Sequence, residues 1–179
     1  MRRRVLPVLP LLCLLACQPI GRASDESFAD LVPVGSPVPD IGFVDSSGAP
    51  ISPWGDEATL VVVLANESLL AGEYLLQVDS SCARLSGDCA RIRRVLVLAP
   101  TLRGHRTRAG WTSVRSQDAE SFGGAMGSPW WQINGAVVGQ SLTATVVDRD
   151  GIIRARYGGM DTWTELELAE TLAGVIEPD

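Results

Sequence analysis

The sequence contains no lysine and only one histidine, His105. A single imidazole excludes a metal site built from several histidines of one chain. All of the basic residues are arginines, and 15 of them stand against 21 acidic residues, so that the formal net charge is -6. Acidic chains repel the phosphate backbone, which argues against nucleic acid as the main partner.

A long apolar run is also lacking. The apolar stretch Val5–Leu15 is interrupted by Pro7 and Pro10, and it is shorter than the roughly 20 residues that a membrane-spanning helix needs. It follows the positive residues Arg2–Arg4. A short apolar core behind a basic start is typical of a signal peptide.

The signal peptide ends in Leu14-Leu15-Ala16-Cys17, which resembles the lipobox of bacterial lipoproteins. The resemblance implies that residues 1–16 are removed and that the thiol of Cys17 carries a diacylglyceryl group, with acyl chains such as palmitate. An ordinary secretory peptide with a cysteine near its cleavage point is the alternative. We therefore expect a lipid-anchored protein on the periplasmic face of the bacterial cell envelope. Gln18 favours the outer membrane over the inner.

Residues 17–31 are polar and small and predict a flexible tether. Residues 32–179 predict one folded domain, because 46% of the chain is apolar and only 20% is charged. The buried-strand pattern at Leu60–Leu64 is followed by helical periodicity over Glu67–Leu85 and by a second buried strand at Val95–Leu98. This order predicts a right-handed βαβ unit.

Weaker patterns complete the domain. Before the βαβ unit, a hairpin around Ser47-Gly48 is expected, and after it a strand at Thr112–Val114 and a short helix at Ala119–Met126. The last expected elements are strands at 143–147 and 152–157 and a helix at 163–176. The first long helix should bury Leu70, Ala71, Tyr74, Leu75, Val78, Cys82 and Leu85 and end at Gly87. The last helix should bury Leu166, Ala169, Leu172, Ala173 and Ile176.

Two motifs carry a family resemblance. Gly35–Asp40 reads Gly-x-Pro-x-Pro-Asp, and Thr143–Ile153 reads Thr-x-x-Val-Val-Asp-Arg-Asp-Gly-Ile-Ile. Together with the βαβ unit and the closing helix, they resemble the redoxin branch of the thioredoxin superfamily, which includes peroxiredoxin-like proteins and the SCO family of copper-handling assembly factors. The resemblance implies a thioredoxin-like α/β fold with a central mixed sheet and flanking helices.

The catalytic part of that family pattern is missing. Relatives place a reactive cysteine where the first long helix begins, because the helix N-terminus favours a thiolate. Here the stretch Asn66–Gly72 contains no cysteine, and Gln140 or its neighbour stands where SCO proteins have a copper-binding histidine. A carboxamide does not replace imidazole as a ligand for a soft metal. Thiol and copper chemistry are therefore not expected at these positions, and no cofactor is expected.

Cys82 and Cys89 are the two thiols left after removal of the signal peptide and lipidation of Cys17. In an oxidising compartment we expect a structural disulfide that ties the helix end to the following loop. The alternative is a displaced redox pair, although a helix C-terminus disfavours a thiolate. Neighbouring arginines, among them Arg84 and Arg91, could offset that effect.

Two further segments are candidate binding sites. Gly104–Arg108 contains His105 and Arg106 in a basic loop beyond the second strand. It is either a solvated loop with an exposed histidine or a contact for an anion, a lipid headgroup or a single metal ion. Trp130 and Trp131 lie in an expected loop, where they either pack over the core or form an exposed patch for a partner or membrane.

These observations support three hypotheses on function. The first is a lipid-anchored thioredoxin-fold protein that lacks thiol catalysis and binds or assembles an envelope partner. The second is a thiol-disulfide oxidoreductase or SCO-like copper chaperone that uses Cys82 and Cys89. The third is a membrane-proximal binding module that uses Trp130, Trp131 and the arginine loop.

Overall fold

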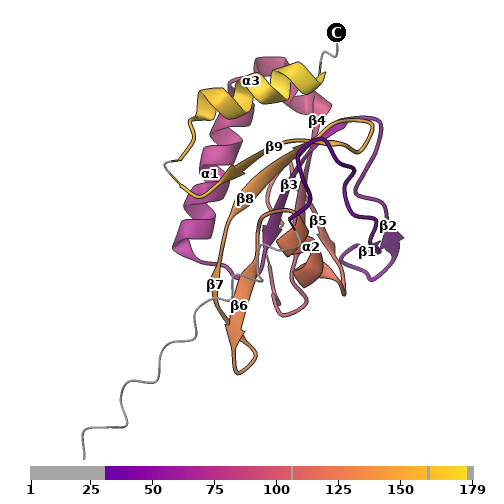
Figure 1. Cartoon of the computed structure of the whole chain (residues 1–179), viewed down its shortest axis with the longest axis vertical. Coiled ribbons are helices and arrows are strands. Elements are labelled where there is room, and N and C mark those ends of the chain that lie inside the picture. Colours follow the sequence, from indigo (N-terminus) through magenta and orange to yellow (C-terminus); the bar gives the residue numbers. More distant parts are fainter. Residues whose placement is uncertain (1–30, 106, 161, 177–179) are drawn as a thin grey trace, which may run out of the picture.

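The computed structural model of the chain describes residues 31–105, 107–160 and 162–176. Its centre is a seven-stranded mixed sheet with the strand order β2-β1-β5-β4-β3-β8-β9 (Figure 1). The strands are β1 (Phe43–Val44), β2 (Pro50–Ile51), β3 (Ala58–Leu64), β4 (Ile92–Leu98), β5 (Thr112–Arg115), β8 (Thr143–Val147) and β9 (Ile153–Gly158). The predicted central mixed sheet is confirmed.

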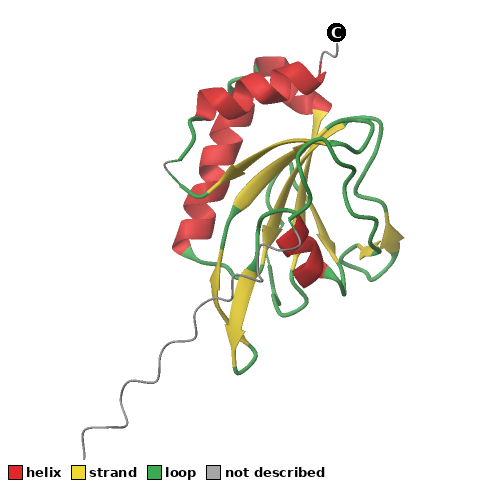
Figure 2. Cartoon of the chain, viewed as in Figure 1, coloured by secondary structure: helices red, strands yellow, loops and turns green. Residues whose placement is uncertain are grey.

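Helices cover both faces of the sheet (Figure 2). They are α1 (Leu69–Ala83), α2 (Ala119–Ala125) and α3 (Glu165–Ile176), and a 3₁₀ helix η2 (Ser86–Arg91) follows α1. α1 and α3 pack on one face and α2 on the other. The signal peptide, Cys17, the tether up to residue 30 and Arg106 lie outside the described residues.

The core is built around β3, whose seven residues are all buried. Leu60, Val62 and Leu64 face α1 and α3, while Val61 and Val63 face α2. β3 pairs in parallel with β4 and antiparallel with β8. A strand covered on both faces is rich in apolar side chains, which explains why the run Leu60–Leu64 revealed it in the sequence.

The helix boundaries differ from the predicted ones. α1 ends at Ala83, before Gly87, because the backbone tightens into η2 and the Arg84 amide donates to Ser80 and Ser81. Leu70 is exposed, because in the first turn of α1 it is Ala71 that packs into the core. In α3 the buried residues include Leu168, while Leu166 and Ala173 are exposed. The apolar residues of α3 are compatible with two different buried faces, and packing against α1 decides which of the two is buried.

The expected loop around Trp130 is instead a β-hairpin, formed by β6 (Trp130–Ile133) and β7 (Ala136–Gln140). Its turn holds Asn134 and Gly135 at φ 52° and 80°. An Asn-Gly pair between apolar residues is the sequence signal for such a turn, and it could have identified the hairpin. The hairpin projects from the lower end of the molecule in Figure 1.

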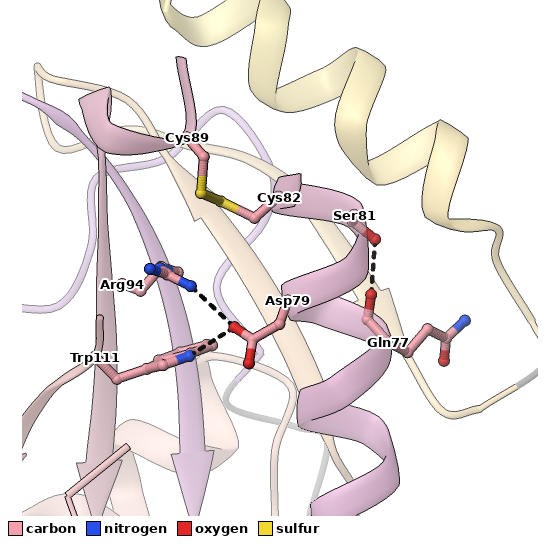
Figure 3. The surroundings of a disulfide bond; sticks show 7 residues. All are labelled: Gln77, Asp79, Ser81, Cys82, Cys89, Arg94 and Trp111. Carbon is pink, nitrogen blue, oxygen red and sulfur yellow. Dashed lines mark hydrogen bonds and ion pairs between the residues drawn. A yellow bond between two sulfur atoms is a disulfide. The ribbon is translucent and has the colours of Figure 1, made fainter. Parts of the chain in front are cut away.

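Asp79 of α1 ties together three segments that are distant in the sequence (Figure 3). Its Oδ1 accepts from Arg94 of β4 at 3.0 Å and from the Trp111 indole at 2.8 Å, and its Oδ2 accepts from Arg108 at 2.7 Å. Arg94 also lies over the Trp111 ring. One carboxylate therefore positions β4 and the segment before β5 against α1.

We predict that Asp79→Ala lowers the free energy of unfolding by about 2–3 kcal/mol, because the Trp111 indole and two guanidinium groups lose their acceptor. Urea denaturation measures the change. Asp88→Ala is the control, because the side chain of Asp88 makes an exposed ion pair with Arg91 at 3.6 Å, which is worth about 0.5 kcal/mol or less. Equal losses in the two variants would contradict the assigned role of Asp79.

Candidate functional site

The candidate site is the junction where β3 ends and α1 begins. Ser68 caps the helix, with an extended backbone (φ −126°, ψ 164°) and an Oγ that accepts from the Ala71 amide at 3.1 Å. Serine is a favoured N-cap because its hydroxyl replaces a missing intrahelical acceptor. The helix dipole favours negative charge at this end, so the junction retains the environment that stabilises a thiolate. It contains no thiol.

Gln140, at the end of β7, occupies this junction with its side chain. Its Oε1 accepts from the amides of Ala65 at 2.8 Å and Asn66 at 2.9 Å, and its Nε2 donates to the Val63 carbonyl at 3.3 Å. The carboxamide thus pairs three backbone groups at the end of β3. Among the positions that the sequence offered for the family's metal-binding histidine, Gln140 is the one that reaches the junction.

The Gln140 side chain holds this junction through hydrogen bonds of an uncharged carboxamide to the backbone. A carboxamide does not act as a nucleophile or carry a charge at neutral pH, and it is a poor ligand for a soft metal. Both of its polar atoms are already engaged by the backbone. Gln140 therefore stabilises the β3–α1 junction and provides no reactive group.

A cleft of about 620 Å³ opens beside Gln140. Apolar side chains from four parts of the chain line it, namely Leu70, Val138, Leu142 and Met160. Asn66 contributes a polar wall, and its Oδ1 is buried with no hydrogen-bond partner among the described residues. The cleft thus combines apolar walls with polar side chains such as Asn66 and Gln140.

Tyr74 supports the cleft from inside the core. Its hydroxyl donates to the Tyr157 carbonyl of β9 and accepts from the Ala144 amide of β8 at 2.6 Å. Burial raises the pKa of the Tyr74 phenol, so the hydroxyl keeps its proton and its donor role at any physiological pH. α1 is consequently held in a definite position against β8 and β9.

His105 does not lie exposed on a solvated loop, and that expectation is wrong. Its side chain is only 8% exposed, and its Nδ1 lies 2.5 Å from Glu67 Oε1. It borders a cavity of about 330 Å³ between Leu64 and Leu75. The Glu67 carboxylate draws the loop over this cavity, a contact between residues 38 positions apart that the local sequence pattern could not indicate.

The two adjacent tryptophans have different environments. Trp130 is buried with Phe122 and Met126 in the core on the α2 side, whereas Trp131 is partly exposed. Successive side chains of a strand point to opposite faces, which explains the split. Of the pair, only Trp131 remains available to a partner.

Cys82 and Cys89 form a disulfide with a Cα–Cα distance of 5.4 Å (Figure 3). Cys82 is fully buried in the last turn of α1, and Cys89 packs against the same core from η2. The N-cap Ser68 lies about 20 Å away along the helix, at 1.5 Å per residue. The bond therefore lies at the opposite end of α1 from the candidate site.

Within residues 31–105, 107–160 and 162–176, no three His, Cys, Asp or Glu side chains are grouped so that they could hold a metal ion. None of the helices in these segments is long and apolar enough to span a bilayer.

No family model and no curated protein matches this sequence, but solved structures do resemble it. ScoI of Bradyrhizobium japonicum with copper bound is 12% identical, with a TM-score of 0.57 over 80% of this chain and 99% of that one. A SCO1/SenC family lipoprotein from Bacillus anthracis is 13% identical, with a TM-score of 0.61 over 81% and 98%. Xanthomonas campestris peroxiredoxin Q is 12% identical, with a TM-score of 0.54 over 80% and 97%.

At such low identity the likeness concerns the fold. The chain has the thioredoxin-like α/β fold that its sequence motifs predicted, and the structures it resembles belong to the redoxin branch that those motifs indicated. A shared fold does not imply a shared activity, because activity depends on the particular residues of a site.

We predict that Gln140→Ala speeds hydrogen exchange at the amides of Ala65 and Asn66 and lowers the free energy of unfolding by about 1–3 kcal/mol, since two buried donors lose their acceptor. Amide exchange followed by NMR measures the first effect and urea denaturation the second. Gln132→Ala is the matched control, because Gln132 is an exposed glutamine of the same hairpin. If Ala65 and Asn66 exchange at the same rate in both variants, Gln140 does not lock the junction.

Proposed function

We propose that this chain is a lipid-anchored protein of the bacterial cell envelope that binds or assembles a partner through a thioredoxin-like domain without thiol catalysis at the usual site. The basic start, the apolar core and the lipobox-like Leu14–Cys17 support the anchor. Gln18 supports a place on the periplasmic face of the outer membrane.

The observation that carries the proposal is the contact of Gln140 with the end of β3. The family resemblance implies thiol or copper chemistry at this junction, and the hydrogen bonds of the Gln140 carboxamide to Val63, Ala65 and Asn66 use its polar atoms. A cysteine is absent from the first turn of α1. The junction therefore supports a positioning role rather than a reaction.

The adjoining cleft suits a short apolar segment of a protein partner. Leu70 and Val138 present apolar surface at its rim, and burial of such surface contributes about 25 cal/mol per Å². Apolar walls with a few placed polar groups are typical of a binding site.

The alternative is a thiol-disulfide oxidoreductase or SCO-like copper chaperone that uses Cys82 and Cys89. Such a role needs an accessible sulfur with a lowered pKa. Cys82 is fully buried and lies at the C-terminal end of α1, where the helix dipole disfavours a thiolate. Both features argue for a structural disulfide.

We predict a reduction potential below about −300 mV for the Cys82–Cys89 pair, which is the range of structural disulfides. Equilibration with glutathione and dithiothreitol buffers, followed by thiol trapping, measures it. The intact chain should not reduce insulin. A midpoint between about −120 and −200 mV, with turnover that Cys82→Ser abolishes, would support the oxidoreductase instead.

A photo-crosslinking amino acid at position 70 should capture an envelope protein in living cells, whereas the same group at position 76 should not. Leu70 and Leu76 are leucines of one helix with nearly equal exposure, 61% and 59%, but Leu70 lines the cleft. The crosslink at position 70 should persist in a variant with both Cys82 and Cys89 changed to Ser. Equal capture at both positions, or loss of capture in that variant, would contradict the proposal.

A further inference from the structure

The hairpin β6–β7 has an outward face that is apolar and uncovered. Trp131 and Ile133 are two residues apart in β6 and so share a face, and Ile133 pairs with Ala136. The pairing shifts between Trp131 and Gln132, where Val138 has no partner of its own and lines the cleft beside Gln140. Trp131 lies flat over Gly139, where a Cβ would come within 2.2 Å of the indole.

This face has no charge on it or around it in the sequence. Between Glu120 and Asp148 there is no Asp, Glu, Lys, Arg or His, although 20% of the whole chain is charged. The turn at Asn134 and Gly135 is polar but neutral. Charged groups are costly in a bilayer, while tryptophan favours its interface. The composition of the hairpin therefore matches a lipid surface.

The chain enters the domain at the base of this hairpin. The Val32 amide donates to the Ala125 carbonyl at 3.1 Å, and Leu31 lies against Gly127, three residues before β6. If Cys17 carries the lipid, as proposed above, the chain from Cys17 to Leu31 spans at most about 50 Å in any conformation. The anchor thus holds the hairpin within reach of the bilayer.

The size of the patch favours lipid over a protein partner. A stable protein interface needs roughly 20–30 residues from each side, whereas this face offers three apolar side chains, Trp131, Ile133 and Ala136. A tether raises the effective concentration of a weak site to the millimolar range. A small apolar face can therefore remain on a membrane that the same chain is anchored to.

We propose that the outward face of β6–β7 inserts into the headgroup boundary of the phospholipid bilayer that carries the anchor. This inference rests on the proposed lipidation of Cys17. Insertion gives the domain two points of attachment and fixes its orientation, with α3 directed away from the lipid, since α3 and the hairpin lie at opposite ends of the molecule (Figure 1). The cleft at Val138 then opens close to the membrane surface.

The test uses the full lipidated chain in vesicles of phosphatidylethanolamine and phosphatidylglycerol, with an environment-sensitive fluorophore on Ile133→Cys. Leu166→Cys on α3 is the matched control, because Ile133 and Leu166 are exposed to 58% and 56%. At position 133 the emission should shift to the blue and be quenched by acyl-chain nitroxides at least about twofold more than at position 166, as expected for insertion by 5–10 Å. Adding Ala136→Asp should abolish most of that difference, because Ala136 is exposed and pairs with Ile133.

Flotation with the vesicles separates the two proposals. A labelled protein that fails to float refutes the lipid anchor, whereas one that floats with equal quenching at positions 133 and 166 overturns the insertion of the hairpin. A blue shift at position 133 that requires an added envelope protein would also overturn it and would assign the face to a protein partner.

Discussion

The three hydrogen bonds of Gln140 connect the hairpin β6–β7 to the junction between β3 and α1. They join the end of β7 to the end of β3, so the hairpin is attached to a strand that is buried at every residue. The same contact lies beside the N-terminal end of α1, where the family resemblance of the sequence led us to look for a sulfur or a metal ligand. These bonds therefore fix one end of the hairpin beside the cleft.

The C-terminal end of α1 is fixed to the rest of the domain, whereas its N-terminal end contributes to the cleft. At its C-terminal end the Cys82–Cys89 bond and the Asp79 cluster hold the helix to η2, β4 and the segment before β5. At its N-terminal end Ser68 caps the first turn and leaves Leu70 exposed at the rim of the cleft. Rigidity at one end allows the other end to present apolar surface without the helix shifting, because Tyr74 fixes its middle.

Sequence patterns predicted the elements whose burial requires a recognisable run of apolar residues within one segment. β3 and β4 read as continuous apolar runs, and the motifs at Gly35–Asp40 and Thr143–Ile153 indicated the fold. The hairpin β6–β7 escaped, because its strands are short, apolar on the outward face and interrupted by a bulge, so that neither strand alternates cleanly. The burial of His105 escaped for another reason: its partner Glu67 is 38 positions away.

By itself the sequence determined which chemical groups are present: a lipobox-like cysteine, two further thiols, one histidine, and no cysteine at the start of the first long helix. The sequence is sufficient for this because each of these features lies within one short segment. Only the tertiary structure decided which groups meet. That Gln140 reaches Val63, Ala65 and Asn66 across more than seventy residues, and that Trp131 is exposed while Trp130 is buried, follows from strand pairing and packing, which act between segments that are distant along the chain.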